Sequence, residues 1–103
     1  MRSDLFLPEA DEEFREAARY YESEAPGLGI AFITEVHSAV ASVLANPYAA
    51  AAAGSGIRQR VLHRFPYNVL YAVEKDTIVI VAVAHQKRRP GYWKARLKQL
   101  ESP

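Results

Sequence analysis

The order of hydrophobic and polar positions predicts two helices near the start of the chain. Residues 3–7 alternate weakly and stop at Pro8, which is typical of a short strand followed by a helix whose first turn accepts proline. The first helix has an apolar face with a spacing of 3.6, made of Ala10, Phe14, Ala17, Ala18 and Tyr21. After "EAPGLG", which breaks the helix, the second helix has an apolar face made of Leu28, Phe32, Val36, Val40, Val43 and Leu44. These patterns predict an antiparallel helical hairpin that ends near Asn46 and Pro47.

From residue 57 onward the hydrophobic period changes to two, which indicates strands. The first of these strands is expected to have an apolar face made of Ile57, Val61 and Phe65. Its opposite face is cationic and carries Arg58, Arg60 and Arg64.

Two further strands and a short tail complete the pattern. Residues 67–74 form the next strand, and "EKDT" turns the chain into the apolar run 78–84, which is typical of a central strand buried on both faces. The alanine-rich segment 48–56 is expected to be a loop, and the tail from Pro90 a short helix.

The element order β-α-α-β-β-β predicts an α+β fold in a single domain, residues 1–103. The helical hairpin is expected to pack on one face of a small antiparallel sheet. The other face is then left partly open for a partner.

Composition narrows the possible chemistry. The chain has no cysteine and only three dispersed histidines, so we expect neither a metal site nor a cofactor. The N-terminus lacks the long uncharged run of a signal peptide or membrane span, and we expect a cytoplasmic protein that does not contact a membrane.

Charge is divided unevenly between the two halves of the chain. Residues 1–53 carry three Arg against nine Asp and Glu, a net charge of −6, whereas residues 54–103 carry ten Lys and Arg against three acids, a net charge of +7. This asymmetry indicates an anionic partner for the basic half, although a solvated cationic surface would give the same pattern.

The residues able to carry chemistry gather in the basic half, without a triad or a phosphate-binding loop. They are Arg58, Arg60, Arg64, His85, Lys87, Arg88, Arg89 and Tyr92. Such a set suits metal-independent RNA cleavage, recognition of a protein partner, or mere solubility. Tyr92 and Trp93 are expected to seal the core beneath exposed Lys87, Arg88 and Arg89, and His85 to be a hydrogen-bonded residue at a strand end.

The ordered motifs "PEADEEFREAARYYE", "PGLGIAF", "GIRQRVLHRFPYNVLYAVE" and "VAVAHQKRRPGYW" resemble the ParE/RelE superfamily of toxins from type II toxin–antitoxin systems. The likeness spans Leu5 to Trp93 and is closest to the ParE branch. It implies a ParD-like antitoxin as partner and growth inhibition by binding DNA gyrase. Because no acidic general base can be placed beside the candidate groups, we favour a toxin that acts without catalysis. RelE-type relatives imply an alternative, which is ribosome-dependent cleavage of mRNA.

The resemblance also suggests roles for residues. If the protein is a nuclease, the candidates for catalysis are Arg64, His85, Arg88 and Tyr92. The candidates for binding the target or the antitoxin are Arg58, Arg60, Arg64, Lys87, Arg88 and Arg89. The sequence departs from the nuclease pattern because Gln86 follows His85 and Tyr92 lies beside Trp93, where packing is expected.

Overall fold

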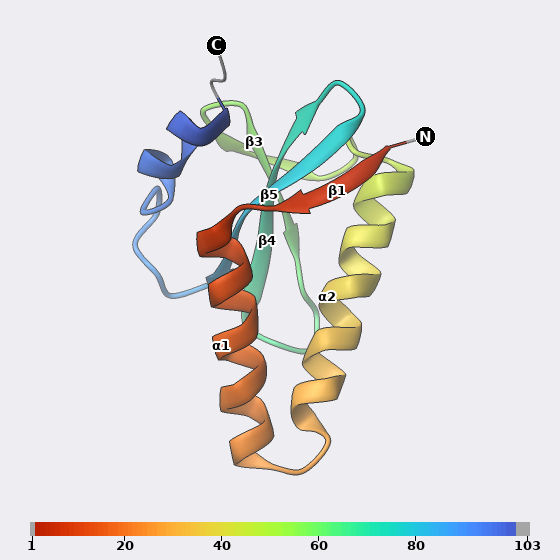
Figure 1. Ribbon diagram of the computed structural model, residues 1–103, viewed down its shortest axis with the longest axis vertical. Helices are drawn as coiled ribbons and strands as arrows, with labels where there is room; N and C mark the ends of the chain where they lie inside the picture. Colours follow the sequence, from red (N-terminus) through yellow and green to blue (C-terminus); the bar gives the residue numbers. More distant parts are fainter. Residues whose placement is uncertain (1, 101–103) are drawn as a thin grey trace.

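The N-terminal half folds as a strand and a helical hairpin in the computed structural model, which describes residues 2–100. Strand β1 (Ser3–Phe6) leads into helix α1 (Pro8–Glu24), where Pro8 occupies the first turn and leaves no intrahelical bond unmade. Helix α2 (Leu28–Ala45) runs back beside α1, and the turn that connects them extends beyond the sheet (Figure 1). The predicted helical hairpin is confirmed.

The start of α2 is capped by a side chain from α1. The Glu22 carboxylate accepts hydrogen bonds from the backbone N–H groups of Gly27, at 3.1 Å, and Gly29, at 3.0 Å. Gly29 lies so close to α1 that an added Cβ would be 2.7 Å from the Ala18 carbonyl oxygen. The segment that breaks the helix therefore also sets how closely the two helices approach.

Across residues 2–100, five strands form one mixed sheet in the order β1-β5-β4-β3-β2. The strands after the hairpin are β2 (Ala51–Gly54), β3 (Ile57–Val61), β4 (Tyr67–Glu74) and β5 (Thr77–His85). These four pair antiparallel in succession, and β1 pairs with β5 in parallel. The α+β fold class is confirmed, and the parallel β1 makes the sheet mixed instead of wholly antiparallel.

Two details of the strand prediction are wrong. The alanine-rich segment expected to be a loop contains β2, because β3 offers unpaired backbone groups that outweigh the weak strand propensity of alanine. Val61 is 47% exposed, and Phe65 is buried in the loop after β3 instead of lying on that strand. Of the three apolar residues assigned to one face of this strand, Ile57 is the one buried within it.

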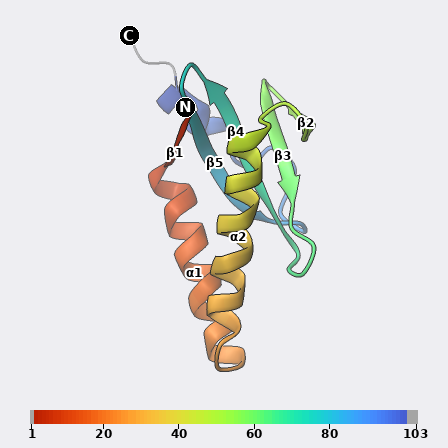
Figure 2. The same cartoon turned by 90° about the vertical axis from the view of Figure 1, so that its right-hand side faces the viewer.

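The helical hairpin covers one face of the sheet (Figure 2). On that face the Tyr67 ring lies 5.2 Å from the ring of Phe32, and fully buried Tyr71 donates its hydroxyl to the Pro47 carbonyl at 2.6 Å. The opposite face, expected to be partly open, is partly covered by the chain's own C-terminal segment, which contains the short 3-10 helix η1 (Lys94–Leu100). Trp93, which precedes η1, is 4% exposed.

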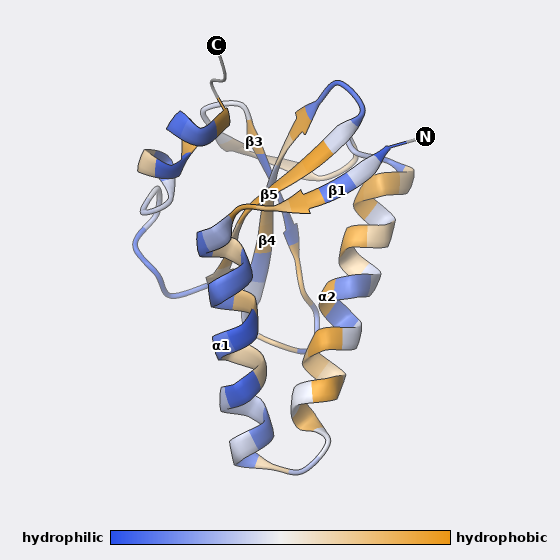
Figure 3. Ribbon diagram, viewed as in Figure 1, coloured by the Kyte–Doolittle hydropathy of each residue, from blue (hydrophilic) through white to orange (hydrophobic). Residues whose placement is uncertain are grey.

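The two helices differ in character. In Figure 3 α1 is mostly hydrophilic and α2 mostly hydrophobic. By length and composition alone α2 could cross a membrane, with a mean hydropathy of 1.7. In the fold it is the core helix, because buried Phe32, Val36 and Val43 lie along its inner face.

Candidate partner-binding site

A hydrogen-bonded turn follows the last strand and carries three cations outward. Its backbone is fixed by bonds from Gln86 N–H to the Pro66 carbonyl at 2.8 Å and from Arg88 N–H to the His85 carbonyl at 3.0 Å. Gly91 closes the segment with a φ of 78°, which a glycine adopts without strain. We call Lys87, Arg88 and Arg89 the basic loop, and all three are exposed.

Two aromatic rings pack beneath the basic loop. Trp93 is buried and Tyr92 is half-buried, whereas the neighbouring cations are exposed. The Arg88 guanidinium carbon lies 3.8 Å from the centre of the Tyr92 ring, a cation–π contact. The predicted arrangement, with the rings below and the cations above, is confirmed.

The Tyr92 hydroxyl is hydrogen-bonded to a carboxylate on α1. It donates a hydrogen bond of 2.7 Å to Glu13 Oε2. Burial, together with this hydrogen bond, raises the pKa of Tyr92 well above its ordinary value. At neutral pH the hydroxyl is therefore protonated and already engaged.

The same carboxylate holds Arg96 of η1. Two parallel hydrogen bonds join the groups, from Arg96 Nη1 to Glu13 Oε1 at 2.9 Å and from Nη2 to Oε2 at 2.7 Å. Both side chains are mostly buried, with 14% and 17% exposed. The hydrogen bonds that Arg96 donates to Glu13 raise the pKa of Arg96, and this bidentate geometry is the strong form of an ion pair.

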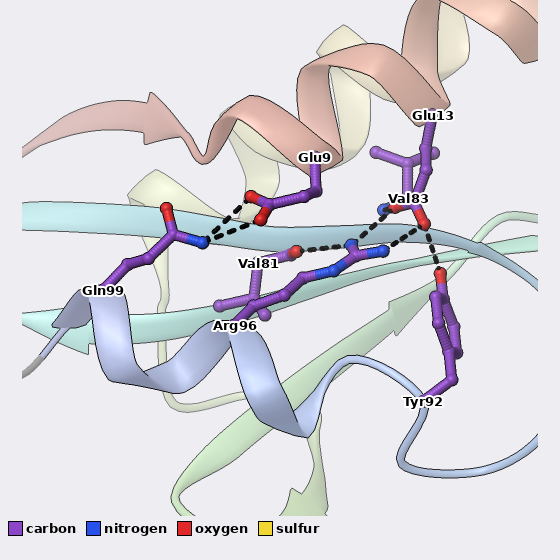
Figure 4. Close-up of polar contacts among 7 residues, drawn as sticks. All are labelled: Glu9, Glu13, Val81, Val83, Tyr92, Arg96 and Gln99. Carbon is purple, nitrogen blue, oxygen red and sulfur yellow. Dashed lines mark hydrogen bonds and ion pairs between the residues drawn. The ribbon is translucent and has the colours of Figure 1, made fainter.

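Glu13 and Arg96 also complete an unpaired edge of the sheet (Figure 4). The partners of β1 on β5 end at Ile80, and the register shift beside Leu70 and Tyr71 leaves Val81 as an extra residue in β5. Beyond this bulge, Arg96 Nη1 donates to the Val81 carbonyl at 3.0 Å, and Val83 N–H donates to Glu13 Oε1 at 3.0 Å. The two side chains thus replace the missing neighbouring strand.

Two hollows flank the basic loop, and Arg88 lines both. The larger, of about 320 Å³, lies on the sheet face opposite the helices, where Arg88 and Arg89 meet the apolar residues Leu70 and Trp93. The smaller, of about 250 Å³, lies between α1 and the end of β5 and is lined by Tyr20 among others. Glu13 and Glu16 also line the smaller hollow, so an anionic chain is favoured at Arg88 from the side of the larger hollow.

Three amide side chains form a ladder in the wall of the larger hollow. Gln86 Nε2 donates to Asn68 Oδ1 at 3.2 Å, and Asn68 Nδ2 donates to Gln59 Oε1 at 3.3 Å. The ladder links β3, β4 and the turn after β5, and it leaves the side-chain oxygen of Gln86 and the side-chain nitrogen of Gln59 as further hydrogen-bonding groups. The hollow therefore combines cations, amides and an apolar floor.

His85 lies where the two hollows meet. Its Nδ1 accepts a hydrogen bond from the Lys87 backbone N–H at 3.0 Å, so the neutral ring carries its proton on Nε2. The ring packs edge-on against Tyr67, with 5.1 Å between ring centres. As predicted, His85 is a hydrogen-bonded residue at the end of its strand.

The arginines in and after β3 lie elsewhere. Arg58 and Arg60 pair with Tyr71 and Val69, so they are on the face that carries the helices, away from the larger hollow. Arg58 donates to the carbonyl of Ala50 at 2.8 Å and to that of Tyr48 at 3.2 Å. The six cations predicted to bind a partner therefore do not form one cluster.

Arg64 lies in the loop between β3 and β4 and is exposed. Its backbone N–H and that of His63 donate to the Glu35 carboxylate of α2, at 3.1 and 2.6 Å, and its guanidinium lies over the Phe65 ring. Its side chain has no hydrogen bond to the basic loop within residues 2–100.

Sequence reasoning missed Glu13 and Arg96 as members of this site. Glu13 reads as one of several acids in the first turns of a helix, where acids favour the helix dipole. Arg96 reads as one of several cations in the tail, and 83 residues separate the two. No local pattern distinguishes the pair from its solvated neighbours.

The architecture places the protein in a class of α+β folds in which a helical hairpin covers a small sheet. The fold is similar to that of a solved chain described as "Chromosomal ParDE TA system from P. aeruginosa", with a TM-score of 0.72 and 19% sequence identity over 82% of this chain and 96% of that chain. No curated protein matches the sequence.

A match between the sequence and a family model identifies the family of this protein. Residues 5–90 match the family model described as "ParE toxin of type II toxin-antitoxin system, parDE". Because the match spans most of the chain, the protein belongs to the ParE toxin family.

Proposed function

We propose that this ParE toxin inhibits growth by binding DNA gyrase through its basic loop, without catalysis, in the cytoplasm where gyrase acts. The observation that carries the non-catalytic mode is the hydrogen bond from the Tyr92 hydroxyl to Glu13. A phenol with a raised pKa that is already bound to a carboxylate does not serve as a general base at neutral pH. Gyrase as the target rests on the resemblance to the ParE branch.

The other nuclease candidates support the same proposal. Nδ1 of His85 is occupied by the Lys87 N–H, and the Arg88 guanidinium is stacked on Tyr92. Arg64 shares no hydrogen bond with any of these groups in the described residues. RNA cleavage would need these side chains to converge on one phosphate, and their present contacts hold them in other roles.

The experiment reads both activities from one preparation. Purified protein is added to a gyrase supercoiling assay and to a translating extract in which mRNA integrity is measured. We expect supercoiling to be blocked and the message to stay intact. Cleaved mRNA with normal supercoiling would replace the proposal by the RelE-type alternative.

We further propose that a ParD-like antitoxin neutralises the protein by placing acidic side chains against the basic loop. Exposed Lys87, Arg88 and Arg89 beside a hollow with an apolar floor suit a segment that alternates acidic and apolar residues. Co-expression with the product of the neighbouring reading frame should restore growth. A complex in which these three cations keep their solvent exposure would contradict this assignment.

A further inference from the structure

We propose that Glu13 is a positioning residue for Arg88, and that Tyr92 transmits its effect. This inference rests on the proposed function in one respect, namely that Arg88 contacts the target. The structural part of it, that α1 sets the orientation of a cation in the loop after β5, stands on the described contacts alone.

The first step is the anchoring of Glu13. Its carboxylate accepts four hydrogen bonds, from Val83 N–H, the Tyr92 hydroxyl and two nitrogens of Arg96, at 2.7 to 3.0 Å. A carboxylate bound to a strand, to the connecting segment and to η1 has little freedom to move. It is therefore a fixed point against which the C-terminal segment is held.

The second step is the link from the carboxylate to the cation. The hydroxyl bond fixes the tip of Tyr92, while Arg88 packs at 3.8 Å and Arg96 at 5.0 Å from the centre of its ring. Arg88 makes no salt bridge within residues 2–100, so this ring is the main restraint on its exposed head group. A ring held at its tip presents a constant face, and Arg88 stays between the two hollows that it lines.

A restrained cation binds better than a free one because less side-chain entropy is lost on association. Among the cations of the basic loop, Arg88 is the one with such an aromatic support within the described residues. The geometry thus distinguishes Arg88 from Lys87 and Arg89, which sequence reasoning treats as equivalent.

The test uses Tyr92→Phe, which keeps the ring and removes the bond to Glu13, and Glu13→Gln. NMR of the full chain reports whether the Arg88 side-chain protons retain the upfield ring-current shift of a guanidinium above an aromatic face. We expect that shift to fall substantially in both variants. Val43→Ala, a core change on α2, is the control for general loss of stability and should preserve it.

The functional readout is the concentration that inhibits supercoiling by half. We expect about a tenfold increase for Tyr92→Phe, corresponding to about 1.4 kcal/mol. In an Arg88→Ala background, Tyr92→Phe should add little, because both changes remove the same restrained cation.

An unchanged Arg88 ring-current shift in Tyr92→Phe would overturn the inference, as would inhibition losses that add fully in the double variant. If the shift responds as expected but the unmodified protein does not block supercoiling, the positioning role stands and the gyrase proposal fails. The two failures are therefore distinguishable.

Discussion

The arginines of β3 and those of the basic loop look alike in sequence and differ in what they do. Arg58 is held by two backbone carbonyls and lies over the Tyr48 ring, so its charge serves the fold. Arg88 and Arg89 follow the last strand with exposed side chains at the rim of a hollow. The cations of the C-terminal half therefore fall into two groups. Structural cations such as Arg58 are bound within the fold, and the exposed cations of the basic loop are free to contact a partner.

The largest expected effect is a loss of inhibition when the exposed cations of the basic loop are removed. The triple change Lys87→Ala, Arg88→Ala, Arg89→Ala should weaken inhibition of gyrase by about a hundredfold, since buried charge pairs across an interface are worth several kcal/mol. The free energy of unfolding should change by about 1 kcal/mol or less because the three side chains are exposed. Supercoiling assays and urea unfolding measure the two quantities.

The matched control removes the same charge elsewhere. Lys75, Lys94 and Lys98 are also exposed, and their replacement by alanine lowers the net charge equally. Equal losses of inhibition in the two triple variants would mean that overall charge, and not the basic loop, drives binding.

The second largest expected effect is a loss of stability when Arg58, a structural cation, is removed. Arg58→Ala should lower the free energy of unfolding by about 1.5–3 kcal/mol, because a charged donor to two backbone carbonyls is lost. Growth inhibition by the folded protein should persist. Arg60→Ala, on the same face of β3, is the control and should cost about 0.5 kcal/mol or less.

The stability of the protein should depend on alkaline pH, because a buried tyrosine lies beside Arg58 and a half-buried one lies beneath Arg88. Burial raises the pKa of Tyr71, beside Arg58, and of Tyr92, beneath Arg88. A phenol with a raised pKa in the folded state stabilises the protein fully below its unfolded pKa of about 10 and loses that contribution as pH rises further. The urea midpoint should therefore fall above about pH 10, and Tyr92→Phe should make this fall shallower.

The smallest effect is expected for Arg64, whose contacts place it neither among the structural cations nor in the basic loop. Arg64→Ala should change the free energy of unfolding by about 0.5 kcal/mol or less and leave inhibition unchanged. A strong loss of toxicity, with the fold intact by circular dichroism, would return Arg64 to the partner-binding surface.

Much of the fold could be predicted from the sequence because its signals are local. The period of the two helices, the Pro-Gly turn between them and the apolar run of β5 each follow from residues close in the chain. Strand β2 could not be predicted, because its pairing comes from β3 and not from its own alanines. The parallel direction of β1 follows from its position beside β5, which is a long-range contact.

The candidate site was predictable only in part. The exposed cations above packed rings follow from "KRRPGYW", where charged and aromatic residues adjoin. The division of the arginines depends on which face of β3 meets the helices, and residue alternation does not specify that. The Glu13–Arg96 pair depends on the end of the β1 pairing at Ile80 and on the bulge at Val81, which together leave the Val81 carbonyl and the Val83 N–H without a partner on β1.

That bulge has a consequence for self-association. Past Val81 the β5 side of the sheet is closed by the side chains of Glu13 and Arg96, so another chain finds no free hydrogen-bonding row there. Strands β1 and β2 stand at the two ends of the strand order, and each has one side without a strand partner in residues 2–100. Each of these end strands is four residues long, so a further chain that pairs with either margin gains few backbone hydrogen bonds.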